Sequence, residues 1–175
     1  MNPEAYNFVP PTFIYPLEQI KFKQYMKENP GACFIAKPSN GLKGKDIFLL
    51  RDINDIEYKN FRGREKTDYI VQRYIDKPLL MDGYKFDLRL YVTLFGSNPV
   101  DSQEWHSFIA KEGLARFCTQ KYKKPTNANL KNNFMHLTNY SLNKASPDYV
   151  HEPENAKDIL KPNQATKRVL STLYK

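Results

Sequence analysis

The sequence has few cysteines, few histidines and no long apolar run, and each scarcity excludes a class of protein. Two cysteines, Cys33 and Cys118, are too few for a disulfide scaffold and lack the spacing of metal ligands. The 3 histidines are scattered, which argues against a zinc site. No apolar stretch approaches the ~18 residues that a membrane span requires, and the opening MNPEAYNFVPP does not resemble a signal peptide. We therefore expect a soluble, intracellular protein.

Basic residues are in excess, but they form no tract. The chain has 27 Lys and Arg against 19 Asp and Glu, a formal net charge of +8. This balance favours an anionic partner: nucleic acid, an anionic membrane surface, a nucleotide or an acidic protein tail. The spread of the charge excludes a basic arm. The 175 residues, 41% of them hydrophobic, suffice for one domain with a core, and no internal repeat is evident.

Hydrophobic patterning predicts short helices mixed with strands. Four prolines in residues 1–16 indicate an extended lead-in. The predicted helices are 17–27, 53–59 and 163–175, and the predicted strands are 32–37, 47–50, 69–75, 86–95, 105–111 and Leu114–Phe117. This mixture favours an α+β fold with a largely antiparallel sheet and flanking helices.

Segment 86–95 is the clearest strand, because its two faces differ sharply. One face is charged, with Lys85, Asp87 and Arg89 at alternate positions. The other face is apolar and consists of Phe86, Leu88, Leu90, Val92 and Leu94. Two interpretations of the charged face stay open: it lines a cleft, or it faces solvent and forms cross-strand ion pairs.

The loop after the strand 32–37 combines glycine with lysine. Lys37 ends the strand, and Gly41, Lys43, Gly44 and Lys45 follow before Asp46. Glycine permits close backbone approach to phosphate, and lysine supplies a point charge. The pattern is not a Walker A loop, since GxxxxGK[ST] is absent. Such loops also occur without any ligand.

Two further segments carry polar groups in apolar surroundings. Arg116 is a lone cation in EGLARF and needs a carboxylate or phosphate partner; an internal ion pair is the simpler explanation. The segment MHLTNYS gathers His136, Thr138, Asn139 and Ser141, which suits either a turn or a ligand site.

Four segments in order resemble the tubulin tyrosine ligase-like family, ATP-grasp ligases that add amino acids to tubulin. They are FIAKPSNGLKGKDIFL, YIVQRYIDKPLLMDGYKFDLRLYV, KEGLARF and FMHLTNYSLNK. HLTNYS and EGLARF are most similar to the glutamate-adding, or polyglutamylase, branch. The resemblance runs from about residue 8 to the end. It implies one partial ATP-grasp-like domain over residues 1–175, truncated at both ends, with the C-terminal part of the fold missing.

The resemblance also implies roles for individual residues. Lys37 and Arg89 would be catalytic, neutralising charge near the transferring phosphate. Arg116, Tyr140 and Ser141 would hold the incoming amino acid. The nucleotide-binding positions would be Lys37, Lys43, Gly44, Gln72, Arg73, Tyr74, Ile75, Lys85, Phe86, Asp87, Thr138 and Asn139.

The implied reaction is ATP-dependent addition of glutamate to glutamate side chains of tubulin through an acyl phosphate. The implied cofactors are ATP and Mg²⁺, and the implied partners are acidic tubulin tails, microtubules and free glutamate. The family's magnesium ligands, an Asp and a Glu-x-Asn pair, would lie beyond Lys175, so no metal ligand is expected in this chain. The implied location is cytoplasmic, at microtubules, with the cilium or basal body as further sites. A membrane is not expected as a partner, and nucleic acid is disfavoured because no recognition motif is visible.

An alternative from a different class stays open: a truncated, non-catalytic paralogue that binds nucleotide, acidic tubulin tails or both. Two positions depart from the family pattern. Asp46 stands where the family loop usually has glycine, which predicts weaker ATP binding. Val169 stands where glutamate-adding members tend to have lysine. The apolar residues Val169, Leu170, Leu173 and Tyr174 are expected to be exposed.

Overall fold

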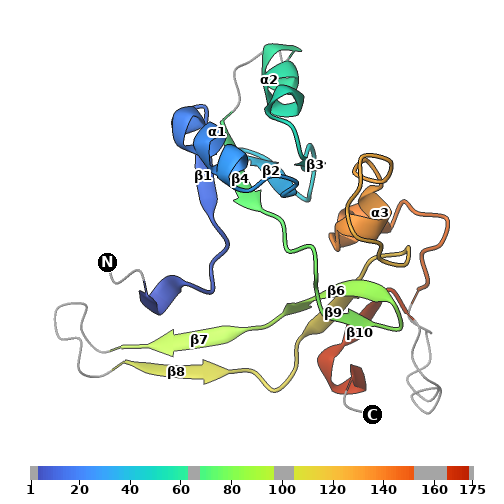
Figure 1. Cartoon of the computed structure of the whole chain (residues 1–175). Helices are drawn as coiled ribbons and strands as arrows, with labels where there is room; N and C mark the ends of the chain where they lie inside the picture. Colours follow the sequence, from blue (N-terminus) through green and yellow to red (C-terminus); the bar gives the residue numbers. More distant parts are fainter. Residues whose placement is uncertain (1–3, 63–67, 97–104, 152–164, 174–175) are drawn as a thin grey trace.

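A computed structural model describes residues 4–62, 68–96, 105–151 and 165–173, with the backbone alone for 59–62. The strands form three sheets, and every strand pair in the described residues is antiparallel (Figure 1). The expected α+β class with antiparallel pairing is therefore confirmed. In the described ranges, no helix has the length and apolar content needed to cross a membrane.

The first sheet lies within residues 12–73, which we call the first lobe. Its strands, in spatial order, are β1 (Thr12–Tyr15), β4 (Tyr69–Arg73), β2 (Phe34–Pro38) and β3 (Phe48–Leu50). Two helices, α1 (Gln19–Glu28) and α2 (Ile53–Arg62), pack against it, as Figure 1 shows at the top of the view. They correspond to the predicted helices 17–27 and 53–59. Phe22, Phe34, Leu50, Ile56 and Val71 are fully buried between helices and sheet.

Alternation along β2 gives the sheet two different faces. Phe34 and Ala36 point into the core of the first lobe. Cys33 and Ile35 point the other way and join a second cluster with Leu49, Tyr74, Tyr122 and Leu130. Because Tyr122 and Leu130 come from the later part of the chain, this cluster joins that part to the first lobe.

The second sheet follows the first lobe and consists of four strands. In spatial order they are β10 (Lys167–Val169), β9 (Leu114–Phe117), β6 (Tyr84–Arg89) and β5 (Leu80–Met81). Asp82 and Gly83 connect β5 to β6 with φ angles of +53° and +81°. Two central residues with positive φ are the signature of a type I′ hairpin turn. The short helices α3 (Asn133–His136) and α4 (Tyr140–Asn143) follow β9.

The prediction of one strand over 86–95 is wrong. The segment divides into β6 and β7 (Val92–Phe95), because β6 pairs with β9 whereas β7 pairs with β8 (His106–Ile109). The β7–β8 pair projects away from the rest of the chain in Figure 1. Its apolar side chains are exposed: Val92 is 61% and Leu94 59% accessible. Alternation predicts that these residues share a face, and it does not specify what covers that face.

The prediction of a C-terminal helix over 163–175 is also wrong within the described residues. Lys167–Val169 forms β10 on the edge of β9, and a 3₁₀ turn, η4 (Leu170–Leu173), follows. The weak helical pattern is overridden because pairing with β9 provides hydrogen bonds for the backbone N–H and C=O groups of this segment. Leu170 is buried, contrary to expectation, whereas Val169 is exposed as expected. Residues 163, 164, Tyr174 and Lys175 lie outside the described ranges.

The Pro-rich lead-in is only partly extended. It contains β1, which pairs with β4, and a 3₁₀ turn, η1 (Glu4–Tyr6). The predicted strands 32–37, 47–50, 69–75, 105–111 and Leu114–Phe117 correspond to β2, β3, β4, β8 and β9.

Candidate functional site

A polar chain crosses the face of the first sheet that turns away from α1 and α2. Lys37 Nζ donates a hydrogen bond to Gln72 Oε1 at 3.0 Å, and Gln72 Nε2 donates to Thr12 Oγ1 at 2.9 Å. Lys37 and Gln72 meet because β2 and β4 are adjacent, with Lys37 opposite Ile70 and Ile35 opposite Gln72. Burial lowers the pKa of Lys37. The ammonium group is therefore held in a half-buried position by a neutral partner.

A second ammonium group, that of Lys85, approaches from β6. Lys85 Nζ donates to Tyr74 Oη at 3.0 Å and to the His136 carbonyl oxygen at 2.8 Å, and it lies 4.4 Å from the Tyr74 ring centroid. Burial is the main cause that lowers the pKa of Lys85, and the positive charge of Lys37 adds to it. Neither ammonium forms an ion pair with a carboxylate of the described residues. Two neighbouring, partly desolvated cations with neutral partners make a site suited to an anion.

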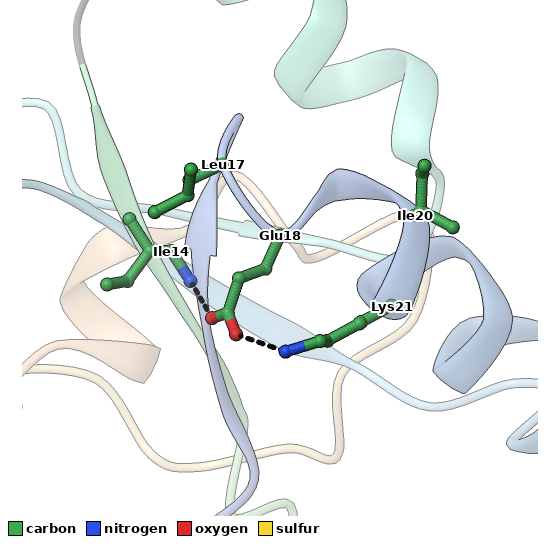
Figure 2. Close-up of a pocket in the computed structure, with 5 residues that line it drawn as sticks. All are labelled: Ile14, Leu17, Glu18, Ile20 and Lys21. Atoms are coloured by element: carbon green, nitrogen blue, oxygen red, sulfur yellow. Dashed lines mark hydrogen bonds and ion pairs between the residues drawn. The ribbon is translucent and has the colours of Figure 1, made fainter.

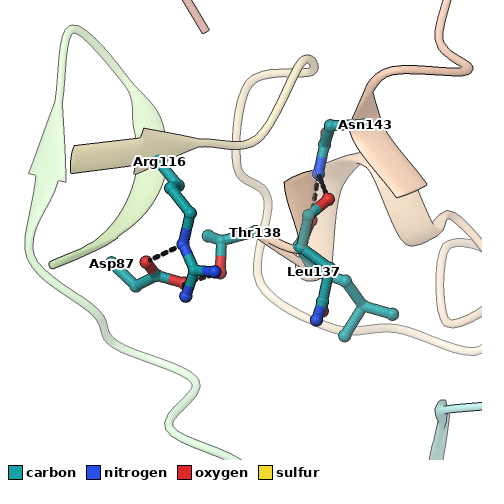
Figure 3. Close-up of polar contacts among 6 residues, drawn as sticks. Asp87, Arg116, Leu137, Thr138 and Asn143 are labelled. Carbon is teal, nitrogen blue, oxygen red and sulfur yellow. Dashed lines mark hydrogen bonds and ion pairs between the residues drawn. The ribbon is translucent and has the colours of Figure 1, made fainter. Parts of the chain in front are cut away.

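Asp87, two residues along β6, is held by Arg116 of β9. Arg116 Nε donates to Asp87 Oδ1 at 2.7 Å and a terminal nitrogen donates to Oδ2 at 2.9 Å, as Figure 3 shows. The Thr138 hydroxyl donates to Asp87 Oδ2. The expectation of an internal ion pair for Arg116 is therefore confirmed. The charged face of β6 turns toward the segment from His136 to Thr138, and it also forms a cross-strand ion pair.

Asn143 holds the backbone of residues 136–139 (HLTN) in place. This role of Asn143 was not identified from the sequence. Its side-chain nitrogen donates to the Leu137 carbonyl at 2.7 Å, as Figure 3 shows. The same nitrogen donates to the Asn139 carbonyl at 3.1 Å. Its side-chain oxygen accepts from the Thr119 backbone at 3.0 Å and from the Thr119 hydroxyl at 3.1 Å. The available sequence signal was an amide side chain close to HLTNYS, in a position that the fold buries completely.

The Gly- and Lys-containing loop reaches the same segment. A methyl group added to Gly44, at φ +85°, would lie 2.8 Å from Asn139 Cγ. Lys43 and Asp46 also have positive φ, at 59° and 58°. The loop thus places Gly44 against Asn139, and glycine would suit the left-handed backbone at Asp46 better than aspartate does.

The four expected hinge residues do not all face the site. Gln72 points into it, whereas the Arg73 guanidinium lies 3.5 Å from Asn29 Oδ1 on the opposite face, and the Arg73 amide donates to Pro11. The Tyr74 amide donates to the Cys33 carbonyl at 2.9 Å. Ile75 is 58% exposed. The backbone groups of Ile75 have no hydrogen-bond partner within the described part of the chain.

Four other expected residues lie apart from the two ammonium groups. Arg89 is exposed, and its guanidinium lies 5.6 Å from the Tyr91 ring centroid. Phe86 points to the other face of β6, where it stacks on Phe117 at 5.4 Å. Ser141 is exposed, and the exposed ring of Tyr140 lies 5.4 Å from Lys167 Nζ. Two residues of the expected amino-acid set, Arg116 and Tyr140, line one narrow hollow together with Thr138 and Lys167, but this hollow has no room for a water molecule.

Both cysteines are buried close to these groups. Cys33 lies beside Tyr74 in the second cluster, and the charge of Lys85 acts on the thiol of Cys118. Burial raises the pKa of Cys33 to about 11 and that of Cys118 to about 12. The thiols are therefore protonated at neutral pH and are not activated nucleophiles.

Another hollow lies between β1 and α1. Its volume is about 550 Å³, and Ile14, Leu17, Glu18, Ile20 and Lys21 line it (Figure 2). The Glu18 carboxylate already accepts from the Ile14 amide at 2.9 Å and from Lys21 at 3.1 Å. This hollow contains none of the expected site residues, and its polar groups already have partners. We therefore place the candidate site at Lys37 and Lys85.

Comparison with known proteins places the chain in a family. The Tubulin-tyrosine ligase family matches residues 1–172, so the chain belongs to it. The human protein "Tubulin polyglutamylase TTLL11" is 43% identical over 155 residues, which cover 85% of this chain and 21% of that protein. The Caenorhabditis elegans protein "Tubulin polyglutamylase ttll-11" is 37% identical and covers 98% of this chain and 23% of its own length. A Tetrahymena thermophila protein named "Probable beta-tubulin polyglutamylase" is also 37% identical, over 89% of this chain and 12% of its own length.

The chain thus spans less than a quarter of the length of these curated relatives. Among solved structures, the C-terminal domain of K. lactis Pby1 is similar with a TM-score of 0.46 and 23% identity, over 81% of this chain and 43% of that one. That protein is described as an ATP-grasp enzyme interacting with the mRNA decapping enzyme Dcp2.

Proposed function

We propose that this chain forms the nucleotide-binding part of an ATP-grasp ligase that adds glutamate to glutamate side chains of tubulin through an acyl-phosphate intermediate. The observation that carries the proposal is the pairing of Lys37 and Lys85, two partly desolvated ammonium groups with neutral partners only. Family membership and the polyglutamylase names of the relatives supply the reaction class.

The side chains around Lys37 and Lys85 suit a nucleoside triphosphate. Lys85 has three ammonium protons and donates two of them to protein oxygens, which leaves one for a phosphate oxygen. Among the described residues Lys37 has one hydrogen-bond partner, Gln72, so two of its ammonium protons are left for a ligand. Lys43 and Gly44 would cover the phosphates, and Asn139 lies against Gly44. The backbone of Ile75 would bind the adenine edge, beside Gln72 and Tyr74.

The reaction balances as two displacements. ATP supplies the terminal phosphoryl group, which would pass to a tubulin carboxylate as ADP leaves. The amine of glutamate would then attack the acyl carbon, and phosphate would leave as the amide forms. Such chemistry depends on positioning and charge neutralisation. Lys37 and Arg89 would neutralise charge on the phosphates, Arg89 by bending its exposed side chain from the end of β6.

The described residues contain no group of three or more His, Cys, Asp or Glu side chains that could hold a metal ion. We therefore assign magnesium no residue and no step in this chain.

For the incoming glutamate, we propose Arg116, Tyr140 and Ser141. Arg116 and Lys167 are opposite each other on β9 and β10, which adds a second cation beside Tyr140. The acceptor would be an acidic tubulin tail, which the net charge of +8 favours. Microtubules, and the cilium or basal body, are the proposed locations.

Calorimetric titration with ATP and magnesium tests the nucleotide site. We expect Lys37→Met and Lys85→Met each to weaken binding about tenfold or more, because each removes a charge-assisted hydrogen bond to phosphate. The matched control is Lys27→Met, an exposed lysine at the end of α1. A folded chain that binds no ATP, or that binds equally well in all four forms, would overturn the proposal.

A further inference from the structure

His136 is fully buried, and both of its ring nitrogens have polar partners. Nε2 lies 3.1 Å from the Asn129 carbonyl oxygen, and Nδ1 lies 3.3 Å from Tyr74 Oη. A carbonyl oxygen only accepts, so Nε2 must carry the proton. Nδ1 of the neutral ring is then an acceptor, and the Tyr74 hydroxyl donates to it.

Lys85 only donates, so the Tyr74 oxygen accepts from it at 3.0 Å, and the Tyr74 proton turns toward His136, where the ring Nδ1 lies at 3.3 Å and the carbonyl oxygen at 3.4 Å. The His136 carbonyl accepts a second proton from Lys85 at 2.8 Å. His136 thus acts on Lys85 twice, through its ring by way of Tyr74 and through its own backbone.

We propose that His136 is a positioning residue that aims the Lys85 ammonium at the bound anion, and that protonation of His136 disables this arrangement. The identity of the anion as ATP rests on the proposed function, whereas the coupling between His136 and Lys85 does not.

Protonation would change the network in two ways. A proton on Nδ1 would face the Tyr74 hydroxyl, which would then have to turn its own proton to the His136 carbonyl oxygen at 3.4 Å, the same oxygen that accepts from Lys85. The imidazolium would also add positive charge beside Lys85. The titratable groups that face His136 are Lys85 from β6, Tyr74 after β4 and Tyr122 after β9, whose rings pack edge-on at 5.8 Å. Cys33, Cys118 and Asp87 lie beyond them, around Lys85 and Tyr74.

The environment of His136 favours its neutral form. Burial lowers the pKa of His136, the bond to Asn129 opposes this, and the charge of Lys85 lowers the pKa further. Burial raises the pKa of Tyr74, so its hydroxyl stays protonated. The network is therefore intact at neutral pH and opens only in acid.

The first test is the affinity for ATP across pH 8 to pH 5.5, measured on the wild type, His136→Asn, His136→Leu and Tyr74→Phe. The Asn side chain supplies an acceptor near Nδ1 and does not titrate. At pH 8 we expect His136→Leu and Tyr74→Phe to bind about tenfold more weakly and His136→Asn to retain most of the affinity. Binding by the wild type should fall more steeply in acid than binding by His136→Asn. Protonation of ATP itself affects both proteins equally, so the difference reports on His136.

The outcomes separate the inference from the proposed function. Equal pH profiles for the wild type and His136→Asn, or unchanged affinity in His136→Leu, would overturn the role of His136. Absence of ATP binding by the folded wild type at pH 8 would instead overturn the proposed function.

A second measurement needs no ligand. NMR titration of the imidazole should show the pKa of His136 rising in Lys85→Met, because the nearby charge is removed, and remaining unchanged in Lys27→Met. An unchanged pKa of His136 in Lys85→Met would overturn the coupling between the two residues, independently of the results for ATP binding.

Discussion

Asp87 and Arg116 lie directly opposite each other on β6 and β9, and the guanidinium of Arg116 holds both oxygens of the Asp87 carboxylate. The side chains are 33% and 29% exposed, so the pair is partly shielded from water. Two parallel hydrogen bonds give this ion pair a defined geometry. A ligand carboxylate that binds Arg116 must therefore share the guanidinium with Asp87 or displace it.

We expect the pair to contribute measurably to stability. A double-mutant cycle with Asp87→Asn and Arg116→Gln, followed by urea unfolding, should give a coupling free energy of about 1–2 kcal/mol, because the pair is bidentate and partly buried. The pair Lys23–Glu57 is the control, because it has a single contact at 2.8 Å and side chains that are 42% and 36% exposed, and it should give less than about 1 kcal/mol. Equal coupling in the two cycles would show that burial and bidentate geometry add nothing.

Asp46→Gly should tighten ATP binding and stabilise the chain. The substitution relieves a left-handed backbone at φ 58° and removes a carboxylate from the proposed phosphate loop. We expect a gain of about 1 kcal/mol in unfolding free energy, measured in urea, and a several-fold lower dissociation constant by calorimetry. Asp82→Gly, at φ 53° in the β5–β6 turn, is the control for backbone relief alone and should leave ATP affinity unchanged. Unchanged or weaker ATP binding by Asp46→Gly would contradict the placement of the loop.

Gly44→Ala should weaken ATP binding by separating the loop from Asn139. The added methyl group would lie 2.8 Å from Asn139 Cγ, closer than van der Waals contact allows. Gly31→Ala is the control, since Gly31 also has positive φ, at 78°, but the nearest atom to the added methyl group lies at 3.4 Å, in the Arg51 side chain. Both substitutions should cost about 1 kcal/mol of stability from backbone strain, and only Gly44→Ala should affect ATP. Equal effects on ATP affinity would mean that contact with Asn139 is unimportant.

Lys85→Met should stabilise the ligand-free chain while it impairs binding. The folded-state pKa of Lys85 lies below its unfolded value, so the charged form is penalised at neutral pH, and the penalty disappears as pH rises past the ordinary lysine range. Removing the charge should raise the melting temperature by about 2–4 °C for a chain of this size. Thermal unfolding at pH 7 checks this, with Lys27→Met unchanged. A lower melting temperature for Lys85→Met would show that its two hydrogen bonds outweigh desolvation.

Stability should fall in acid through His136. Its folded-state pKa is lowered, so above its ordinary value of 6.5 the ring is neutral in both folded and unfolded chains. As pH falls below that value the unfolded chain binds the proton first, and unfolding becomes easier until the folded-state pKa is passed. Urea unfolding between pH 7.5 and pH 5 should show a smaller decline for His136→Asn than for the wild type. Parallel declines would assign the acid sensitivity to other groups.

Local patterns in the sequence predicted the elements well and their partners poorly. The common face of Lys85 and Asp87 follows from strand alternation, which depends on neighbouring residues alone. The position of Arg116 opposite Asp87 depends on the register between β6 and β9, which strand periodicity does not contain. The break between β6 and β7 has the same cause, because alternation continues through it while the pairing strand changes.

The contacts of His136 also could not be predicted from sequence patterns, because they join distant segments. MHLTNYS indicated hydrogen-bonding groups, yet the burial of His136 depends on Tyr74 and Tyr122, which come from separate segments. Asn143 and the Asn129 carbonyl complete the arrangement through contacts that no spacing pattern marks. The residue types that could bind an anion were therefore visible in the sequence, whereas the residues that hold them in place required the fold.

All four strands of the first sheet and every residue of its core cluster lie within residues 12–73. During synthesis this lobe can collapse and complete its core before the ribosome has translated the remainder, since N-terminal units fold first. Lys37 is then already in place, but Lys85 and the His136 carbonyl that orients it arrive later. We therefore expect the first lobe to form before the proposed anion site, which also requires the segment HLTNYS.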